Sequence, residues 1–206
     1  MSAARALQIP ASARLQYRLF DADDSELLFE LDQDEAVMRF INGGRKTSRA
    51  EIAQRLLPRM LSYRDPLKGY GIWQVCSKAD QQQLPAAYLG WILVRPMGFF
   101  SDQPSSDHLE VGWRFKQPAW GQGFATEAAH AVMAALAQQG TVRYFSALAD
   151  PNNSGSIAVM KKLGMQFICQ QQVQDPLGVQ QAVVYQMAVR EHQPQHNNFS
   201  SLDTTT

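Results

Sequence analysis

Apolar residues recur along the chain in short runs separated by segments of helical periodicity. Seven of these runs are rich in β-branched and aromatic residues, which favour β-strands. Because helical segments lie between them, the order predicts an α+β domain, a sheet with helices on its faces. The strands are expected at residues 15–20, 71–77, 86–95, 108–115, 142–148, 166–173 and 182–190.

Capping residues mark the ends of the expected helices. Asp23 and Asp24 can cap a short first helix, and Ser48 with Glu51 has the spacing of a capping box. Gly164 is suited to end the last helix, because glycine readily adopts the left-handed conformation there. The helices are expected at residues 23–31, 34–40, 48–63, 124–139 and 154–163.

The two ends of the chain differ from the middle. Residues 1–12 show no clear period and are treated as an N-terminal extension. Residues 191–206 are polar with almost no apolar anchor, so we expect a flexible tail. One domain is therefore expected over residues 13–190.

Composition excludes several classes of protein. Of the 206 residues, 45% are hydrophobic and 18% charged, the balance of an ordinary globular domain. Formal net charge is +0 and there is no strongly basic run, so a nucleic-acid partner is not expected. No apolar stretch approaches the ~20 residues of a membrane span. Without a signal-peptide pattern, and with Cys76 and Cys169 isolated rather than in a CxxC pair, we expect buried thiols and a cytoplasmic location.

The segment from Trp120 to Ala128 (WGQGFATEA) is the most informative part of the chain. Gly121 and Gly123 allow a turning backbone to approach a ligand, because no Cβ stands in the way. The helix that follows leaves its first N–H groups unpaired and has the positive end of its dipole there. A glycine turn leading into a helix is therefore a candidate phosphate site.

Glu110 stands in the apolar strand just before this turn. Near a phosphate site it could act as a general base, although an exposed strand position is the common place for a glutamate. Gly112, two residues later, suggests a β-bulge or a close backbone approach.

A second group of polar residues surrounds the start of the last helix. Asn153 and Ser156 lie three residues apart and could face a ligand, while Asn153 could instead cap the helix. Lys161 and Lys162 could meet a phosphate, or simply offset the dipole at the helix C-terminus.

In their order and spacing these residues resemble the GNAT superfamily of N-acetyltransferases. The resemblance is closest to the ribosomal-protein-alanine acetyltransferase (RimJ/RimL-type) branch and extends over about residues 15–190. It rests on Val37–Ile41 and the glycines after it, Glu110–Trp113, Trp120–Ala128, Asn153 with Ser156, and Lys162–Met165.

The resemblance implies a mixed, mostly antiparallel sheet of seven strands, splayed between the fourth and fifth, with helices on both faces. Acetyl-CoA as acetyl donor would lie in the gap, and no metal is implied. The diphosphate would be held by Gly121, Gln122, Gly123, Phe124, Ala125 and Thr126. The pantetheine arm would pair with the backbone from Trp113 to Phe115, and Asn153 and Ser156 would lie beside the cofactor.

Two positions depart from the pattern of the family. Trp120 stands where the phosphate signature has arginine or glutamine, and its ring cannot replace that donor. Met160 stands where many members have a tyrosine that protonates the leaving thiolate.

The chemistry implied is transfer of an acetyl group from a thioester to a primary amine by direct attack in a ternary complex. The amine would belong to a protein N-terminus or to a small molecule, and the enzyme would be a monomer or homodimer. Glu110, directly or through a water, is the candidate base, and an N–H near Gly112 would polarise the carbonyl. Ser156 is the one nearby hydroxyl that could protonate the thiolate.

The acceptor side is expected at about residues 32–45. Asp32, Asp34 and Glu35 could attract a cationic amine there, or be solvated carboxylates at a helix start. His108 and His130 are interpreted as packing or surface residues.

Other readings of the motifs fit less well. A dinucleotide-binding enzyme would need a third glycine where Thr126 stands and a second βαβ half, and a P-loop would need a Gly-Lys-Ser/Thr sequence. The main alternative is a non-catalytic acyl-CoA-binding module.

Overall fold

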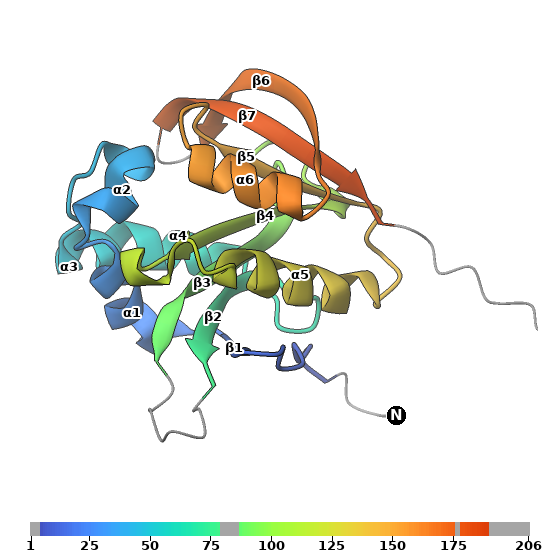
Figure 1. The fold of residues 1–206 in the computed structure, drawn as a ribbon, viewed down its shortest axis with the longest axis horizontal. Coiled ribbons are helices and arrows are strands. Elements are labelled where there is room, and N and C mark those ends of the chain that lie inside the picture. The colour runs from blue at the N-terminus through green and yellow to red at the C-terminus, as the bar shows by residue number, and fades with distance from the viewer. Residues whose placement is uncertain (1–4, 79–86, 176–177, 190–206) are drawn as a thin grey trace, which may run out of the picture.

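A computed structural model describes residues 5–78, 87–175 and 178–189 of the chain. It contains one seven-stranded sheet in the order β1-β2-β3-β4-β5-β7-β6 (Figure 1). Only β4 and β5 are parallel, and every other neighbouring pair is antiparallel. With helices on both faces of the sheet, the predicted α+β architecture is confirmed.

All seven predicted strands are present; the strand at residues 71–77 has the predicted ends, and each of the others is shifted at one end or both. The largest shift is at the last strand, which begins four residues before the expected Ala182. Its first four residues are exposed and so carry no burial pattern, but they pair with β6 through the backbone. Residues 86 and 190, expected at strand ends, lie outside the described part of the chain. The strands are β1 (Leu15–Leu19), β2 (Gly71–Ser77), β3 (Tyr88–Met97), β4 (Ser105–Phe115), β5 (Tyr144–Ala149), β6 (Gln166–Asp175) and β7 (Gly178–Ala188).

The helix predicted over residues 48–63 is the least regular one. Ser48 caps it as expected, since its Oγ accepts from the Glu51 N–H at 3.1 Å. The reciprocal half of the capping box is absent, because the Glu51 carboxylate binds the guanidinium of Arg45 instead. A π-helical turn then precedes Pro58, whose missing N–H and bulky ring disturb the preceding turn.

The remaining helices fall near their predicted positions. Asp34 caps α2 and Asn153 caps α6 through their side-chain oxygens. Gly164 has the left-handed backbone (φ +84°) expected after α6. The helical elements are η1 (Ala22–Asp24), α1 (Ser25–Leu31), α2 (Glu35–Asn42), α3 (Arg49–Glu51), η2 (Ile52–Leu56), α4 (Leu57–Ser62), η3 (Gln117–Ala119), α5 (Phe124–Ala137) and α6 (Ser154–Lys162).

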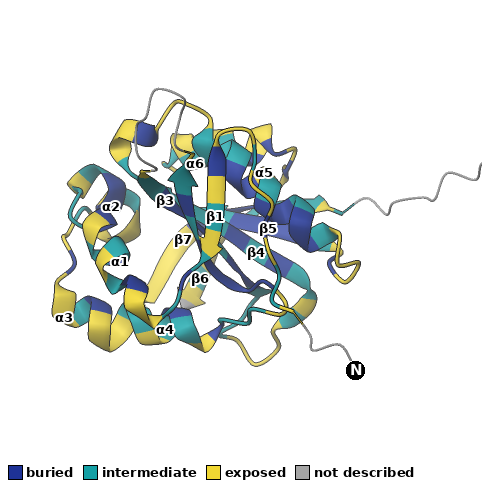
Figure 2. Cartoon of the chain, turned by 90° about the horizontal axis from the view of Figure 1, so that it is seen from below, coloured by how far each residue is buried: buried dark blue, intermediate teal, exposed yellow. Residues whose placement is uncertain are grey.

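One apolar core lies on each face of the sheet. The larger core packs α5 and α6 against one face, with Val132, Leu136 and Met160 fully buried. The smaller core packs the helices between β1 and β2 against the opposite face, around Phe20 and Ile52. Buried residues accordingly lie along the middle of the sheet, and exposed ones along the outer sides of the helices (Figure 2).

The segment before β1 is attached to the domain, although it has no regular structure over residues 5–12. Ile9 is 7% exposed and belongs to the larger core, and the Leu7 N–H donates to the Pro66 carbonyl at 2.8 Å. The expected tail at residues 191–206 lies outside the described residues.

Candidate active site

The sheet opens between its two parallel strands. Strands β4 and β5 pair over three positions, from His108 opposite Tyr144 to Glu110 opposite Ser146. Beyond Glu110, β4 continues for five residues paired with β3, while β5 continues paired with β7. The strands therefore diverge, which confirms the predicted splay. The facing backbone groups of β4 are left available to a strand-like ligand.

The glycine turn lies between η3 and α5, beside this opening. Gly121 (φ +73°) and Gly123 (φ +79°) both have left-handed backbones, which glycine adopts without strain. A Cβ on Gly121 would meet nothing within 4 Å, so the turn is open on that side. No side chain caps the start of α5, where the Glu127 N–H bonds to the Gly123 carbonyl at 3.0 Å. The amides from Gly123 to Thr126 therefore lie at the positive end of the helix dipole, as an anion site requires.

Side chains from the N-terminal segment bind the turn and the first turn of α5. Nothing in the sequence indicated these contacts. Arg14 donates through Nε to the Glu127 carboxylate at 2.7 Å and through Nη1 to the Gln122 carbonyl at 3.0 Å. Its guanidinium also lies over the Phe124 ring, 4.2 Å from the centroid. More than 100 residues separate Arg14 from the turn, so spacing along the chain gave no signal.

One hydroxyl group also binds the Glu127 carboxylate, and a second hydroxyl donates to the first. Ser12 Oγ donates to Glu127 at 2.7 Å, and Tyr17 OH donates to Ser12 Oγ at 2.8 Å. Burial raises the pKa of Tyr17 to about 12, which keeps its hydroxyl protonated. Burial also raises the pKa of Glu127, but hydrogen bonds from Ser12 and Arg14 outweigh it, and the net pKa is below the usual value.

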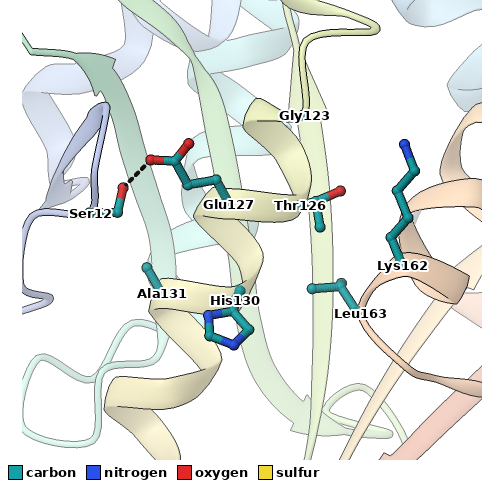
Figure 3. Close-up of a pocket in the computed structure, with 8 residues that line it drawn as sticks. All are labelled: Ser12, Gly123, Thr126, Glu127, His130, Ala131, Lys162 and Leu163. Atoms are coloured by element: carbon teal, nitrogen blue, oxygen red, sulfur yellow. Dashed lines mark hydrogen bonds between the residues drawn. The ribbon is translucent and has the colours of Figure 1, made fainter.

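A groove of about 500 Å³ runs over the first turns of α5 (Figure 3). The N-terminal segment borders it on one side and the end of α6 on the other. Two nitrogen-bearing side chains, His130 and Lys162, lie at its walls. The groove is lined by Ser12, Gly123, Thr126, Glu127, His130, Ala131, Lys162 and Leu163.

Glu110 lies where the sheet opens, on the face away from α5. Its two carboxylate oxygens accept from Nε and Nη2 of Arg95, both at 2.8 Å. The side chains of Glu110 and Arg95 are 14% and 10% exposed. The guanidinium of Arg95 lies over the rings of Tyr63 and Phe100, at 5.8 and 5.2 Å. Glu110 is therefore held in one orientation rather than exposed at a strand surface.

A second polar group follows along the same face. The Nε2 atom of His108 lies 2.8 Å from Ser146 Oγ and 3.3 Å from Gln186 Nε2. Burial lowers the pKa of His108, and the neighbouring Asp107 carboxylate opposes this shift. These bonds join three neighbouring strands where β4 and β5 begin to diverge, so His108 is a packing residue with a polar partner.

The expectation of a β-bulge at Gly112 is wrong. Gly112 pairs with Leu93 in regular register, and the irregularity of this strand pair lies at Pro96 and Met97. A Cβ on Gly112 would make ordinary van der Waals contact with the Leu93 side chain, at 3.4 Å.

Residues of α6 approach β4 from the far side of the opening. Asn153 Oδ1 accepts from the Ser156 N–H at 3.0 Å, so the capping interpretation of Asn153 is confirmed. Ser156 Oγ accepts from Trp113 Nε1 at 3.3 Å, which connects α6 to β4. Met160 is fully buried in the larger core. Among Asn153, Ser156 and Met160, it is Ser156 that presents a hydroxyl toward β4.

The three carboxylates expected on the acceptor side have different environments. Asp32 is 1% exposed and pairs with the guanidinium of Arg114, so it is not a solvated helix-start residue. Asp34 caps α2, as the alternative interpretation held. Glu35 is exposed, and its carboxylate lies 3.8 Å from Lys46 Nζ.

The two cysteines are unbonded and half-buried, less buried than expected. Burial raises the pKa of the Cys76 thiol, which disfavours the nucleophilic thiolate. Among the described residues, no group of three or more His, Cys, Asp or Glu side chains could hold a metal ion. None of the helices described is long and apolar enough to cross a membrane.

Comparison with known proteins places these features in a family. A family model described as acetyltransferase (GNAT) domain matches residues 14–166. The uncharacterized protein YkkB of Bacillus subtilis (strain 168) is 37% identical over 59 residues, 29% of this chain and 34% of that protein. The FsC-acetyl coenzyme A-N(2)-transacetylase of Aspergillus fumigatus is 26% identical over 120 residues, 57% of this chain and 48% of that protein. The chain thus matches about a third to a half of the length of these two relatives.

Solved structures share the fold. An acetyltransferase (GNAT family) from Bacillus anthracis superposes with a TM-score of 0.64 at 20% identity, over 86% of this chain and 96% of that one. RimL, a ribosomal L7/L12 alpha-N-protein acetyltransferase in complex with coenzyme A, superposes with a TM-score of 0.65 at 16% identity, over 88% of this chain and 97% of that one. The aminoglycoside acetyltransferase AAC(6')-Ib, also in complex with coenzyme A, superposes with a TM-score of 0.62 at 17% identity, over 84% of this chain and 94% of that one. The match over residues 14–166, together with the splayed sheet and the glycine turn, shows that the chain belongs to the GNAT acetyltransferase family.

Proposed function

We propose that this protein is an acetyl-CoA-dependent N-acetyltransferase that acetylates a primary amine. The observation that carries the proposal is the position of the open glycine turn beside the gap between β4 and β5. An anionic group bound at the start of α5 can extend an arm along the unpaired edge of β4. Such an arm would end near Glu110, the last position at which the two strands pair.

The residues of the turn and the groove would hold the nucleotide half of the donor. The amides of Gly121–Thr126 are proposed to bind the diphosphate, and the backbone of Trp113–Phe115 the pantetheine arm. Lys162 and His130 lie at the walls of the groove and are available to a further phosphate. Asn153 and Ser156 would lie on the far side of the arm, with Ser156 Oγ as the donor nearest to the thiolate.

Glu110 is proposed as the base that takes a proton from the attacking amine, directly or through a water. Each of its oxygens accepts one bond from Arg95 and keeps a further lone pair for an amine or a water. Arg95 would then position the carboxylate, and the aromatic rings around Arg95 would keep that pair in place. No acyl-enzyme is expected, because neither cysteine lies in a sequence motif of a nucleophile and burial raises the pKa of the Cys76 thiol.

The acceptor is proposed to be a protein N-terminal α-amino group or a small-molecule amine. An α-amino group is partly neutral near pH 7 because its pKa is about 8, whereas a lysine side chain near 10.4 requires more help. The similarity to RimL supports the first choice and the similarity to AAC(6')-Ib the second. We propose the RimJ/RimL-type branch, one catalytic domain over residues 13–190, and a cytoplasmic location.

The test is release of free thiol from acetyl-CoA in the presence of a panel of amines and N-terminal peptides. Release that depends on one class of amine supports the proposal and identifies the acceptor. Tight binding of coenzyme A without release from any member of the panel would favour the non-catalytic binding module. A burst of thiol equal to the enzyme concentration, before any amine is added, would contradict direct attack.

A further inference from the structure

Arg14 has no role in the function proposed so far, yet its guanidinium binds a carbonyl of the glycine turn directly. It precedes β1, and its side chain is 48% exposed. One edge of its guanidinium binds Glu127 and another binds the Gln122 carbonyl, in the middle of the turn. Its Nη2 atom lies 3.6 Å from the position that a Cβ on Gly123 would occupy. The side chain is therefore packed against the turn from the side of the N-terminal segment.

The partner of Arg14 is a carboxylate in an unfavourable place for an anion site. Glu127 lies in the first turn of α5 and lines the groove, and its pKa is below the usual value. A negative charge there stabilises the helix but repels a phosphate that approaches the same amides. Three donors surround the carboxylate: Ser12 Oγ, the Arg14 N–H and Arg14 Nε, at 2.7, 2.8 and 2.7 Å. Of these, only the Arg14 guanidinium carries the charge that cancels it.

The bond to Gln122 has a second consequence for an incoming anion. A carbonyl oxygen directed into the turn would repel a phosphate in the same way as a carboxylate. Nη1 of Arg14 holds the Gln122 carbonyl on the side of the N-terminal segment, at 3.0 Å. Stacking of the guanidinium on Phe124 at 4.2 Å fixes this arrangement at the first residue of α5. The neighbouring amides stay directed toward the open side of the turn.

We infer that Arg14 is a positioning residue for the coenzyme A diphosphate, which neutralises Glu127 and holds the Gln122 carbonyl away from the bound anion. The N-terminal segment thus completes a cofactor site whose other parts lie more than 100 residues later. This inference rests on the proposed function, since it takes the glycine turn to be the diphosphate site.

A double-mutant cycle tests the neutralising role. Arg14→Gln leaves Glu127 charged in the groove wall, so coenzyme A should bind about tenfold more weakly by calorimetry, or about 1.4 kcal/mol. Arg14→Gln combined with Glu127→Gln removes both charges and should recover most of that loss. The loss should also shrink as salt is raised, because the screening length falls from about 8 Å at 0.15 M to about 3 Å at 1 M.

Arg18, four residues after Arg14, provides a matched control. The Arg18 side chain is 49% exposed and is paired with Asp24, a carboxylate that is 8% exposed against 17% for Glu127, but not with the turn. Arg18→Gln should therefore bind coenzyme A like the parent. In turnover, Arg14→Gln should raise the KM for acetyl-CoA and leave the KM of the amine and the kcat at saturation unchanged. A purely structural defect would change all three. Arg14→Lys keeps the charge beside Glu127 but loses the forked contact with Gln122 and the stacking on Phe124. It should therefore bind coenzyme A about threefold more weakly than the parent and still more tightly than Arg14→Gln.

Each outcome decides one question. A double variant that binds no more tightly than Arg14→Gln, or an Arg14→Gln that binds like the parent, overturns the inference and leaves the proposed function intact. A tenfold loss in Arg14→Lys also overturns it, and this variant serves if Arg14→Gln does not fold. A parent protein that fails to bind coenzyme A refutes the proposed function itself, and the inference with it.

Discussion

Replacing Glu110 by glutamine tests whether burial makes the Glu110–Arg95 pair a structural element as well as part of the site. The two side chains are 14% and 10% exposed and share two bonds of 2.8 Å. Solvent-exposed ion pairs contribute under about 1 kcal/mol to the free energy of unfolding. Loss of one partner from a buried pair costs about 3–5 kcal/mol, because the remaining charge keeps its desolvation cost. We expect Glu110→Gln to lower the free energy of unfolding by about 3 kcal/mol, near the lower end of that range, since some solvent reaches the pair.

Chemical and thermal unfolding measure this loss. For a chain of this size each kcal/mol corresponds to about 2–4 °C, so the Tm should fall by roughly 6–12 °C. Glu26→Gln is the control: Glu26 binds Arg49 through two bonds of 2.9 Å, but both side chains are 65% exposed. Its unfolding midpoint should not change. A Glu110→Gln variant as stable as the parent would refute the argument that burial sets the strength of the pair.

The same variant tests the catalytic role once stability is taken into account. Turnover must be compared at a temperature at which both proteins are folded, because partial unfolding alone would lower the rate. A general base contributes about 10²- to 10⁴-fold, so kcat should fall by that factor while acetyl-CoA affinity stays unchanged. Equal kcat for Glu110→Gln and the parent across the pH range would remove Glu110 from the mechanism.

Two further predictions concern the backbone turn and the polar group on β4. Gly123→Val places a β-branched residue at φ +79°, which strains the turn, so binding of coenzyme A measured by calorimetry should weaken while kcat at saturation is kept; unchanged affinity would exclude the turn as the diphosphate site. The pKa of His108 is lowered by burial, so the folded protein favours the neutral ring; stability should be full above the unfolded pKa of about 6.5 and fall as the pH drops below it. His108→Gln should flatten that part of the stability curve from urea unfolding, and an unaltered slope would contradict the assignment.

Local patterns in the sequence determined the elements and the glycine turn. Alternation of apolar residues and capping chemistry act over a few neighbouring positions, so strands such as Gly71–Ser77 and the caps at Ser48 and Asn153 were predicted correctly. The left-handed turn could be predicted because Gly121 and Gly123 adopt that backbone without strain. The splay of the sheet was predicted only through the resemblance to the GNAT superfamily that these motifs carry. Two local rules failed: the Glu51 carboxylate binds Arg45 instead of closing the capping box, and Gly112 pairs with Leu93 in regular register without a bulge.

The tertiary structure alone decided how charges are paired. Glu110 and Arg95 lie fifteen residues apart and Arg14 and Glu127 more than a hundred, and no periodicity connects such positions. Whether a carboxylate is solvated, buried or neutralised depends on which distant element packs against it. The burial of Asp32 beside Arg114 has the same origin. Residue types along the chain thus determine where a turn or strand forms, whereas the electrostatic state of a side chain depends on neighbours that only folding brings together.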